Sequence, residues 1–255
     1  MRRTLFFLWA IAGWAALPAG AWAETATVAV ASNFLGPFQH IAKAFEAETE
    51  HRARIVSGST GKLFAQVVHG APFDVFLAAD AKRPELLEEQ QLAVTGSRFT
   101  YAIGRLTLWS ADPKGIDGDG ASVLKRGTFR HLALANPKTA PYGKAAQSTL
   151  QTLNLWEPLQ PRLVRGENVG QAFQFAATGN AEIGFVALSQ VLALPPSQQG
   201  SRWDVPPHYH DPIEQDAVLL ATGRGNGAAT ALMRFLRSAQ AKQMIEQSGY
   251  TVSGD

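Results

Sequence analysis

Short apolar runs of β type alternate with segments of helical periodicity along most of this 255-residue chain. The runs are rich in Val, Ile, Leu and Ala on both faces, which is typical of strands buried between two layers of helices. The expected strands are residues 25–31, 54–57, 74–79, 106–110, 132–136, 162–164, 183–186 and 217–221. This alternation predicts an α/β fold with mixed, mostly parallel sheets.

Four apolar stripes with a period of 3.6 residues lie between these runs and predict amphipathic helices. The stripes are Phe38, Ile41, Ala42 and Phe45; Leu63, Phe64, Val67 and Val68; Val169, Ala172, Phe173 and Ala176; and Leu232, Met233, Phe235 and Leu236. Helices that follow buried strands are expected to cover the faces of the sheets.

Two changes in composition indicate where the chain passes between two lobes. Residues 101–120 leave the first α/β set and run into a Gly/Asp-rich loop, and residues 195–212 are rich in Pro, Ser and Gln. Two crossings predict that one lobe is inserted within the other. The expected parts are residues 24–105 for the start of lobe 1, 106–210 for the inserted lobe 2, and 211–255 for the return to lobe 1.

The first 23 residues have the pattern of a cleavable signal peptide. Arg2 and Arg3 precede an apolar run over residues 5–17, and Ala21 and Ala23 supply the small residues expected before a cleavage site. A membrane anchor is the alternative, but a spanning helix needs roughly 20 apolar residues. The pattern therefore predicts an exported protein without an anchor.

Charge and cysteine content exclude several classes of function. Without the leader, the 23 basic residues fall by two and equal the 21 acidic ones, and no basic stripe remains for a nucleic-acid backbone. The chain has no cysteine, which rules out disulfides, thiol catalysis and cysteine-ligated metals.

Four predicted strand-to-helix loops share small or hydroxyl residues and at least one glycine. They are residues 31–36, 57–61, 140–143 and 166–170. Ligands bind at the carboxyl ends of parallel strands, where helix N-termini offer unpaired N–H groups and a partial positive charge. The loops therefore predict an anion site, with neutral donors from Ser32, Asn33, Ser59, Thr60 and Tyr142. The alternative is that these residues are ordinary helix caps.

Other motifs do not indicate catalysis or a metal centre. The segment before Lys62 is not a phosphate-binding loop, because Val56 stands at the first glycine position and Leu63 follows the lysine. Lys62 is therefore expected to face solvent. His208, His210 and Asp211 form the one metal-like cluster, which we interpret as a polar segment near a crossing. Nucleophile-elbow, His-Glu-x-x-His and Gly-x-Gly-x-x-Gly motifs are all missing from the sequence.

The order of several short blocks resembles the periplasmic molybdate-binding proteins of molybdate ABC transporters, which have the two-lobed class II solute-binding fold. The likeness covers essentially the whole chain after residue 23. The blocks are residues 29–34, 57–61, 70–76, 136–137 with 141–143, 167–169 and 183–186.

The resemblance implies a periplasmic protein that holds an oxyanion in the cleft between its lobes, with hydroxyl and N–H donors and no countercharge. The matching positions are Ser32, Asn33, Ser59 and Thr60 from lobe 1, and Tyr142 and the N–H of Val169 from lobe 2. Some members use a tyrosine where this chain has Ala187, so that contact is expected to be lost or replaced.

The resemblance also implies the cargo and the partners. It predicts high-affinity capture of molybdate or tungstate and delivery to an ABC transporter permease by hinge closure. It further predicts a monomer that is not an enzyme and has no cofactor, no nucleic-acid partner and no direct metal ligands.

Hydrogen-bond energetics are consistent with such a site. A hydrogen bond to a charged group contributes roughly 1.5–3 kcal/mol. About six of them exceed the roughly 10 kcal/mol of a tens-of-nanomolar complex, which leaves a margin for desolvation and closure. A site made only of donors would also disfavour a protonated anion such as hydrogen phosphate, whose O–H needs an acceptor. Glu167 is expected to face away from it.

Other functions remain as alternatives. The protein could bind another tetrahedral oxyanion such as sulfate or thiosulfate. A ferric-ion site would need paired tyrosines and carboxylates, and the chain has only four tyrosines. An exported hydrolase or lyase on the same scaffold would need a base near Ser59 or Thr60, and the sequence indicates none. A sensor or adhesion module would have the same fold without a tightly bound anion, and the four matched loops argue against it.

Overall fold

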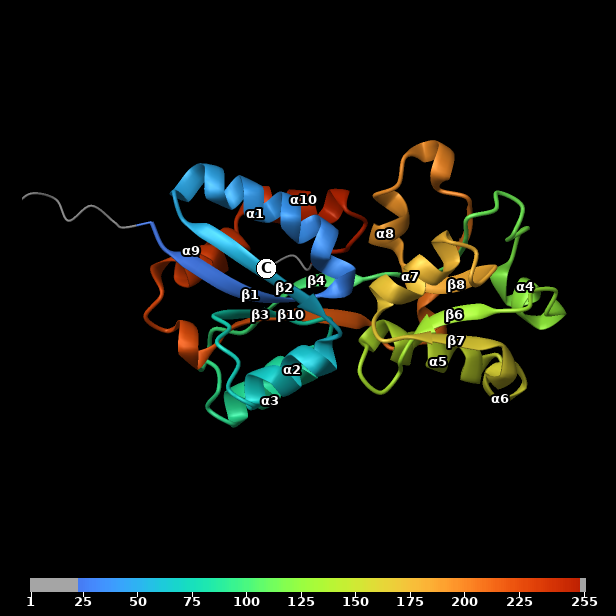
Figure 1. The fold of residues 1–255 in the computed structure, drawn as a ribbon, viewed down its shortest axis with the longest axis horizontal. Helices are drawn as coiled ribbons and strands as arrows, with labels where there is room; N and C mark the ends of the chain where they lie inside the picture. The colour runs from blue at the N-terminus through green and yellow to red at the C-terminus, as the bar shows by residue number, and fades with distance from the viewer. Residues whose placement is uncertain (1–22, 253–255) are drawn as a thin grey trace, which may run out of the picture.

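The computed structural model describes residues 23–252, and it divides into two α/β lobes that lie side by side (Figure 1). The predicted signal peptide falls on residues 1–23 and so lies almost wholly outside the described residues. Within residues 23–252, no helix is both long enough and apolar enough to span a bilayer.

Each lobe is built on a five-stranded sheet. The first sheet has the order β2-β1-β3-β10-β4 and the second has the order β7-β6-β8-β5-β9. The strands of the first sheet are β1 (Thr25–Ala31), β2 (Arg52–Gly58), β3 (Val75–Leu77), β4 (Phe99–Gly104) and β10 (Ile213–Leu219). The strands of the second sheet are β5 (Leu106–Ser110), β6 (Leu132–Ala135), β7 (Leu163–Gly166), β8 (Ile183–Ala187) and β9 (Ser201–Asp204).

Parallel and antiparallel pairings are balanced in both sheets. Strand β1 pairs in parallel with β2 and β3, and β6 pairs in parallel with β7 and β8. Strand β10 is antiparallel to β3 and β4, and β5 is antiparallel to β8 and β9. The α/β class is confirmed, but parallel pairings are not in the majority. The antiparallel strands are β10 and β5, and each of them enters its sheet directly after the chain has crossed from the other lobe.

The chain passes between the lobes at two places. A single residue, Arg105, separates β4 of the first sheet from β5 of the second. The return runs from the end of β9 to the start of β10 and includes a short 3-10 turn, η4 (Pro207–Tyr209). Strands β4 and β9 were not among the predicted strands, because both lie in segments interpreted as connections.

Helices cover both faces of the first sheet. Those of lobe 1 are α1 (Leu35–Thr49), α2 (Thr60–Val68), α3 (Lys82–Glu89), α9 (Gly227–Phe235) and α10 (Ala239–Gln247). One face packs against α1, α9 and α10 through a core that includes Phe38, Phe45 and Leu232. The other face packs against α2 and α3 through Leu63 and Leu87. In Figure 1 these two layers lie above and below the sheet.

The second sheet is covered in the same way. The helices of lobe 2 are α4 (Gly120–Arg126), α5 (Pro141–Thr152), α6 (Trp156–Leu159), α7 (Val169–Ala177) and α8 (Leu188–Leu192). Helices α4, α5 and α6 share a core with β5, β6 and β8 that includes Leu124, Leu150 and Phe185. Helices α7 and α8 pack on the opposite face, where Trp109 stacks on Phe173 with ring centroids 5.0 Å apart.

The shortest elements are five 3-10 helices within the described chain. They are η1 (Ser32–Phe34), η2 (Gln160–Arg162), η3 (Pro196–Gln198), η4 and η5 (Ala221–Gly223). Helix η1 matters most for the site, because it places the first predicted loop directly at the end of β1.

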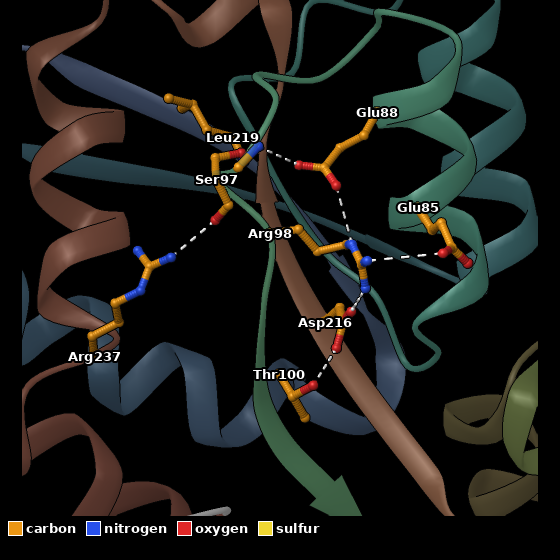
Figure 2. A network of polar contacts seen from close by, with 9 residues as sticks. Glu85, Glu88, Ser97, Arg98, Thr100, Asp216, Leu219 and Arg237 are labelled. Carbon is orange, nitrogen blue, oxygen red and sulfur yellow. Dashed lines mark hydrogen bonds and ion pairs between the residues drawn. The ribbon is translucent and has the colours of Figure 1, made fainter. Parts of the chain in front are cut away.

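An ion pair between the buried Asp216 and the partly exposed Arg98 stabilises lobe 1, where it joins β10 to α3 and β4 (Figure 2). The Asp216 side chain is only 1% exposed, and it accepts hydrogen bonds from Arg98 at 2.8 Å and from the Thr100 hydroxyl at 2.7 Å. Arg98 also donates to Glu88 at 3.1 Å. The hydrogen bond to Asp216 is the main cause that raises the pKa of Arg98. The pair thus holds a charged carboxylate within the sheet, beside the neighbouring residue Gln215.

Candidate functional site

A small cavity lies between the two lobes where the four predicted loops meet. Its volume is about 10 Å³, far below the roughly 300–1,000 Å³ of sites that hold drug-sized ligands. The lining residues are Ala31, Ser32, Asn33, Gly58, Ser59, Thr60, Ala79, Ala140, Pro141, Tyr142 and Val169. None of these lining residues has an ionised side chain at neutral pH, so any charge on a ligand must be balanced by dipoles.

Three helices of at least nine residues begin at the wall of this cavity. Ser59 is the N-cap of α2, Ala140 is the N-cap of α5, and Val169 is the first residue of α7. The first N–H groups of a helix have no partner within the helix and carry a partial positive charge. Two of these N-termini belong to lobe 2 and one to lobe 1, so the cavity is lined by positive dipoles from both sides.

Ser59 and Thr60 supply hydroxyls from lobe 1. The Ser59 side chain is 2% exposed, and its Oγ has no hydrogen-bond partner among the described residues. Ser59 also makes no side-chain cap to α2, so it is not an ordinary capping residue. The Thr60 Oγ1 accepts a hydrogen bond from the Ala79 N–H at 3.0 Å, which leaves its own hydrogen to donate elsewhere.

Tyr142 supplies the hydroxyl from lobe 2. Its side chain is 2% exposed, and its oxygen accepts a hydrogen bond from the Gln215 Nε2 at 3.3 Å. Burial, and secondarily the nearby Tyr250 and Tyr101, raise the pKa of Tyr142 well above its usual value. The phenol therefore keeps its proton at neutral pH and can act as a donor.

Asn33 lines the cavity, but its side chain is engaged elsewhere. Its Nδ2 donates to the Gln215 Oε1 at 2.8 Å and to the Tyr250 hydroxyl at 3.1 Å. An amide nitrogen has only two hydrogens, so both are committed. Any hydrogen bond from Asn33 to a ligand would have to come from its backbone N–H.

Ser32 and α7 meet from opposite lobes. The Gly170 N–H points at the Ser32 Oγ at 3.4 Å, which is a long hydrogen bond. The carbonyl oxygen of Val169 lies 3.5 Å from the Gln190 Nε2. The first of these contacts places the first turn of α7 against η1, so Val169 lines the cavity together with Ser32 and Asn33 of lobe 1.

Two further contacts join the lobes at the edge of the cavity. The Gly61 N–H donates to the carbonyl oxygen of Thr139 at 2.8 Å. The Lys62 Nζ lies 2.7 Å from the Glu167 Oε2, and both side chains are about half exposed. Lys62 and Glu167 therefore pair with each other outside the cavity lining. The structure thus holds the two lobes in a closed arrangement.

All six residues predicted to bind a ligand line this one cavity: Ser32, Asn33, Ser59, Thr60, Tyr142 and Val169. Three residues that form hydrogen bonds behind the lining were not predicted from the sequence: Gln215, Tyr250 and Ser189. The only sequence feature that sets them apart is that each is a polar residue within a buried segment. Ala187 is fully buried at the N-cap of α8, where its N–H donates to the Gln190 Oε1 at 3.0 Å.

The histidine segment near the second crossing is not a metal site in this structure. His208 packs against Tyr209 with ring centroids 4.2 Å apart, and the His210 Nδ1 lies 2.7 Å from the carbonyl oxygen of Asp211. Over residues 23–252, no cluster of three or more His, Cys, Asp or Glu side chains has the arrangement to hold a metal ion.

Known proteins share this sequence over most of its length. The molybdate-binding protein ModA of Azotobacter vinelandii is 50% identical over 234 residues, which is 92% of each chain. The molybdate-binding protein ModA of Rhodobacter capsulatus is 48% identical over 235 residues, covering 92% of this chain and 90% of the relative.

Solved structures share the fold. The periplasmic molybdate-binding protein of Azotobacter vinelandii matches with a TM-score of 0.86 and 41% identity, covering 90% of this chain and 100% of the other. The sulfate-binding protein SubI of Mycobacterium tuberculosis matches with a TM-score of 0.74 over 90% of this chain and 87% of the other. Its 15% identity establishes a common fold alone.

A family profile accounts for both likenesses. The profile described as "Bacterial extracellular solute-binding protein" matches residues 26–251, which include both sheets and the whole cavity lining. Its span and the near-half identity of full-length relatives assign this chain to the family of bacterial extracellular solute-binding proteins.

Proposed function

We propose that this protein binds molybdate or tungstate in the periplasm and delivers it to the permease of an ABC importer. The observation that carries this proposal is the cavity between the lobes, which is small, uncharged and surrounded by donors. The Ser59 hydroxyl is buried there without a partner among the described residues, and the N-termini of α2, α5 and α7 lie at the wall of the same cavity.

Such a site favours a compact, doubly negative anion. A buried hydroxyl or N–H without a partner costs about 1–3 kcal/mol, and an anion that accepts hydrogen bonds from these groups removes that cost. The positive ends of three helices add a favourable electrostatic contribution without a countercharge. The same donors offer nothing to a cation, which disfavours a ferric-ion function.

The choice of molybdate or tungstate over sulfate rests on the named relatives. The relatives that are 48–50% identical to this chain are described as molybdate-binding proteins. The sulfate-binding neighbour shares only 15% of its residues with this chain. Size distinguishes sulfate from the larger molybdate and tungstate, because a rigid ring of donors cannot contract around a smaller anion without strain.

Binding rather than catalysis is the role that the cavity supports. The lining residues include no His, Asp, Glu or Lys that could act as a general base. Tyr142 is the one titratable group in the lining, and burial raises its pKa well above the usual value. We further propose that the protein works as a monomer and presents its closed form to the permease, with the signal peptide directing it to the periplasm.

Tryptophan fluorescence tests this proposal on the protein without residues 1–23. The mature protein is titrated in parallel with molybdate, tungstate, sulfate and hydrogen phosphate. Trp109 stacks on Phe173 in lobe 2, and Trp203 packs against Tyr209 near the second crossing, so both can report lobe movement.

We expect saturable binding of molybdate or tungstate well below the concentration needed for sulfate. Tighter binding of sulfate or thiosulfate would assign the protein to the other oxyanion class. Failure to bind any of these anions in fluorescence and in calorimetry would refute the proposal. Gel filtration of the ligand-bound protein tests the monomer.

A further inference from the structure

A chain of buried hydrogen bonds runs behind the cavity and ends at Tyr142. It begins at the carbonyl oxygen of Asn33, which accepts hydrogen bonds from the Tyr250 hydroxyl at 2.8 Å and from the Ser189 Oγ at 3.2 Å. It continues through the Asn33 amide to Gln215, and from Gln215 to the Tyr142 hydroxyl. Gln215 is completely buried and does not itself line the cavity.

The carbonyl oxygen at the start of this chain fixes the direction of each bond that follows. A carbonyl oxygen can only accept, and Tyr250 donates its single hydrogen either to it or to the Ser189 Oγ at 3.0 Å, which can itself donate to the carbonyl. The oxygen of Tyr250 must then be the acceptor in its contact with the Asn33 side chain, and Asn33 presents Nδ2 there. The same Nδ2 faces Gln215, which must therefore present its oxygen.

The orientation of Gln215 decides the role of Tyr142. With the Oε1 of Gln215 held by Asn33, its Nε2 points at Tyr142 and donates to the phenol oxygen at 3.3 Å. The phenol hydrogen cannot point back toward an N–H donor, so it is directed away from Gln215, toward either the Tyr250 hydroxyl, with which Tyr142 also interacts, or the cavity that Tyr142 lines. A bound anion is a stronger acceptor than the Tyr250 oxygen, which already accepts from the Asn33 Nδ2, so the hydrogen is donated to the anion when the cavity is filled.

A β-bulge strengthens this orientation. In the pairing of β10 with β4, Gln215 is opposite Ala102 and Asp216 is opposite Thr100, so Tyr101 is the extra residue. A bulge changes the direction of the side chain that it carries. The hydroxyl of Tyr101 lies 3.0 Å from the Gln215 Oε1 and 3.0 Å from the Ala78 carbonyl oxygen, so its single hydrogen is shared between these two acceptors. The Gln215 Oε1 thus accepts a full hydrogen bond from Asn33 and a shared one from Tyr101.

We infer that Gln215 is a specificity-determining residue that holds the Tyr142 hydroxyl as a donor and so excludes anions that carry an O–H group. This inference rests on the proposed function. Gln215 does not touch the ligand and acts through Tyr142. With Gln215 in place, a ligand oxygen beside Tyr142 must accept a hydrogen bond. An anion with an O–H in that position would meet a second donor and find no acceptor.

The two residues belong to different lobes, which ties this selection to closure. Gln215 lies on β10 of lobe 1 and Tyr142 lies in the first turn of α5 in lobe 2. The Tyr142 hydroxyl is therefore fixed by Gln215 only when the lobes meet. Selection against O–H groups is thus a property of the closed form.

The test compares three anions of the same charge in mildly alkaline buffer, where phosphate is mainly the hydrogen phosphate dianion. Molybdate and sulfate carry no hydrogen, whereas hydrogen phosphate carries one, and sulfate controls for its small size. The Gln215→Leu variant frees the Tyr142 hydroxyl to accept as well as donate. We expect molybdate affinity to fall roughly tenfold. The molybdate-to-hydrogen-phosphate affinity ratio should also fall, while the molybdate-to-sulfate ratio stays near the wild-type value.

A double-mutant cycle with Tyr142→Phe separates this role from a structural one. If Gln215 acts through Tyr142, the Gln215→Leu change has little further effect on either ratio in the Tyr142→Phe background. Additive effects of the two changes would overturn the inference. Thr149→Val is the matched control, because it removes a buried hydrogen bond of 2.9 Å to Ala145 elsewhere in α5. It should lower the unfolding temperature and leave both ratios unchanged.

A second variant keeps the test decisive if Gln215→Leu does not fold. Tyr250→Phe removes the hydroxyl that sets the direction of the chain and retains the ring, which packs edge-on against Phe34 with centroids 5.4 Å apart. We expect the same selective loss of discrimination against hydrogen phosphate. A folded variant that binds molybdate with unchanged ratios would refute the inference and leave the proposed function standing. Wild-type protein that binds neither molybdate nor tungstate would refute both.

Discussion

The Gly61 N–H donates to the carbonyl oxygen of Thr139 at 2.8 Å, and this bond joins the first turn of α2 in lobe 1 to the loop before α5 in lobe 2. The two backbones approach closely because Gly61 has no side chain. A Cβ at Gly61 would lie 2.9 Å from the Thr139 oxygen and 3.0 Å from the Thr139 Cα. Both are backbone atoms that cannot rotate away.

Gly61→Ala should therefore hinder closure without harming the fold. Alanine favours a helix over glycine by roughly 1 kcal/mol, so the unfolding temperature should not fall. Molybdate affinity should fall, because the donors of the two lobes no longer reach the same anion. Small-angle scattering should show no compaction when ligand is added. The control is Gly36→Ala, where a Cβ meets nothing within 4 Å. Equal affinity in Gly61→Ala and wild type would show that ligand binding does not need this spacing.

Ser59→Ala should separate ligand binding from stability. Loss of one hydrogen bond to an anion should weaken molybdate binding by roughly 1.5–3 kcal/mol in calorimetry. The ligand-free protein should be as stable as wild type or more so, since a buried hydroxyl without a partner is removed. Thr139→Val is the matched control, because the Thr139 Oγ1 is also buried without a partner but lies outside the cavity lining. Unchanged affinity in Ser59→Ala would remove this hydroxyl from the site.

Arg98→Met should destabilise lobe 1. The Asp216 carboxylate would stay almost fully buried and keep only the Thr100 hydroxyl of the bonds shown in Figure 2. Removing one partner of a buried pair costs about 3 kcal/mol or more in the free energy of unfolding, measured by urea denaturation. Arg126→Met, which breaks the exposed pair with Asp117, should cost less than about 1 kcal/mol. Similar losses in both variants would show that the Arg98 pair has no special role.

Glu182 should contribute to acid sensitivity in lobe 2. Partial burial opposes its ionisation, but hydrogen bonds from the Arg130 side chain and the His131 N–H outweigh burial and lower its pKa from 4.5 to about 2. A lowered folded-state pKa gives stability that is present above pH 4.5 and is lost as the pH falls toward 2. Between those pH values Glu182→Gln should therefore lose less of its unfolding free energy than wild type. Glu89→Gln, which removes an exposed carboxylate, is the control variant.

The sequence predicts the lining of the cavity better than the groups behind it. Ser32, Ser59 and Val169 lie shortly after strands and at the start of helices, a local pattern that can be recognised without coordinates. Gln215 and Tyr250 lie far from these loops along the chain, and no local periodicity indicates that they meet Asn33. The role of the Asn33 side chain could not be predicted for the same reason, because its partners are 182 and 217 residues away.

Local sequence patterns also failed to predict β4 and β9, the strands that precede the two crossings between the lobes. Strand β9 is the polar segment Ser201–Asp204, and β4 carries a bulge at Tyr101, so neither shows a regular apolar pattern. Their pairings are antiparallel and depend on how the chain returns from the other lobe. Tertiary context decides such strands, whereas the long buried run of β1 was predicted over its full length, residues 25–31.

Gly104 is the last residue of β4, directly before the one-residue link between the lobes. A Cβ there would lie 2.2 Å from the Tyr142 hydroxyl oxygen and 2.4 Å from the Gln215 Nε2. The one-residue link between the lobes and the contact between Tyr142 and Gln215 therefore occupy the same few ångströms. Tyr142 belongs to lobe 2 and Gln215 to lobe 1, so this contact crosses from one lobe to the other directly beside the link. Any bulk added at Gly104 would act on the link and on the contact together.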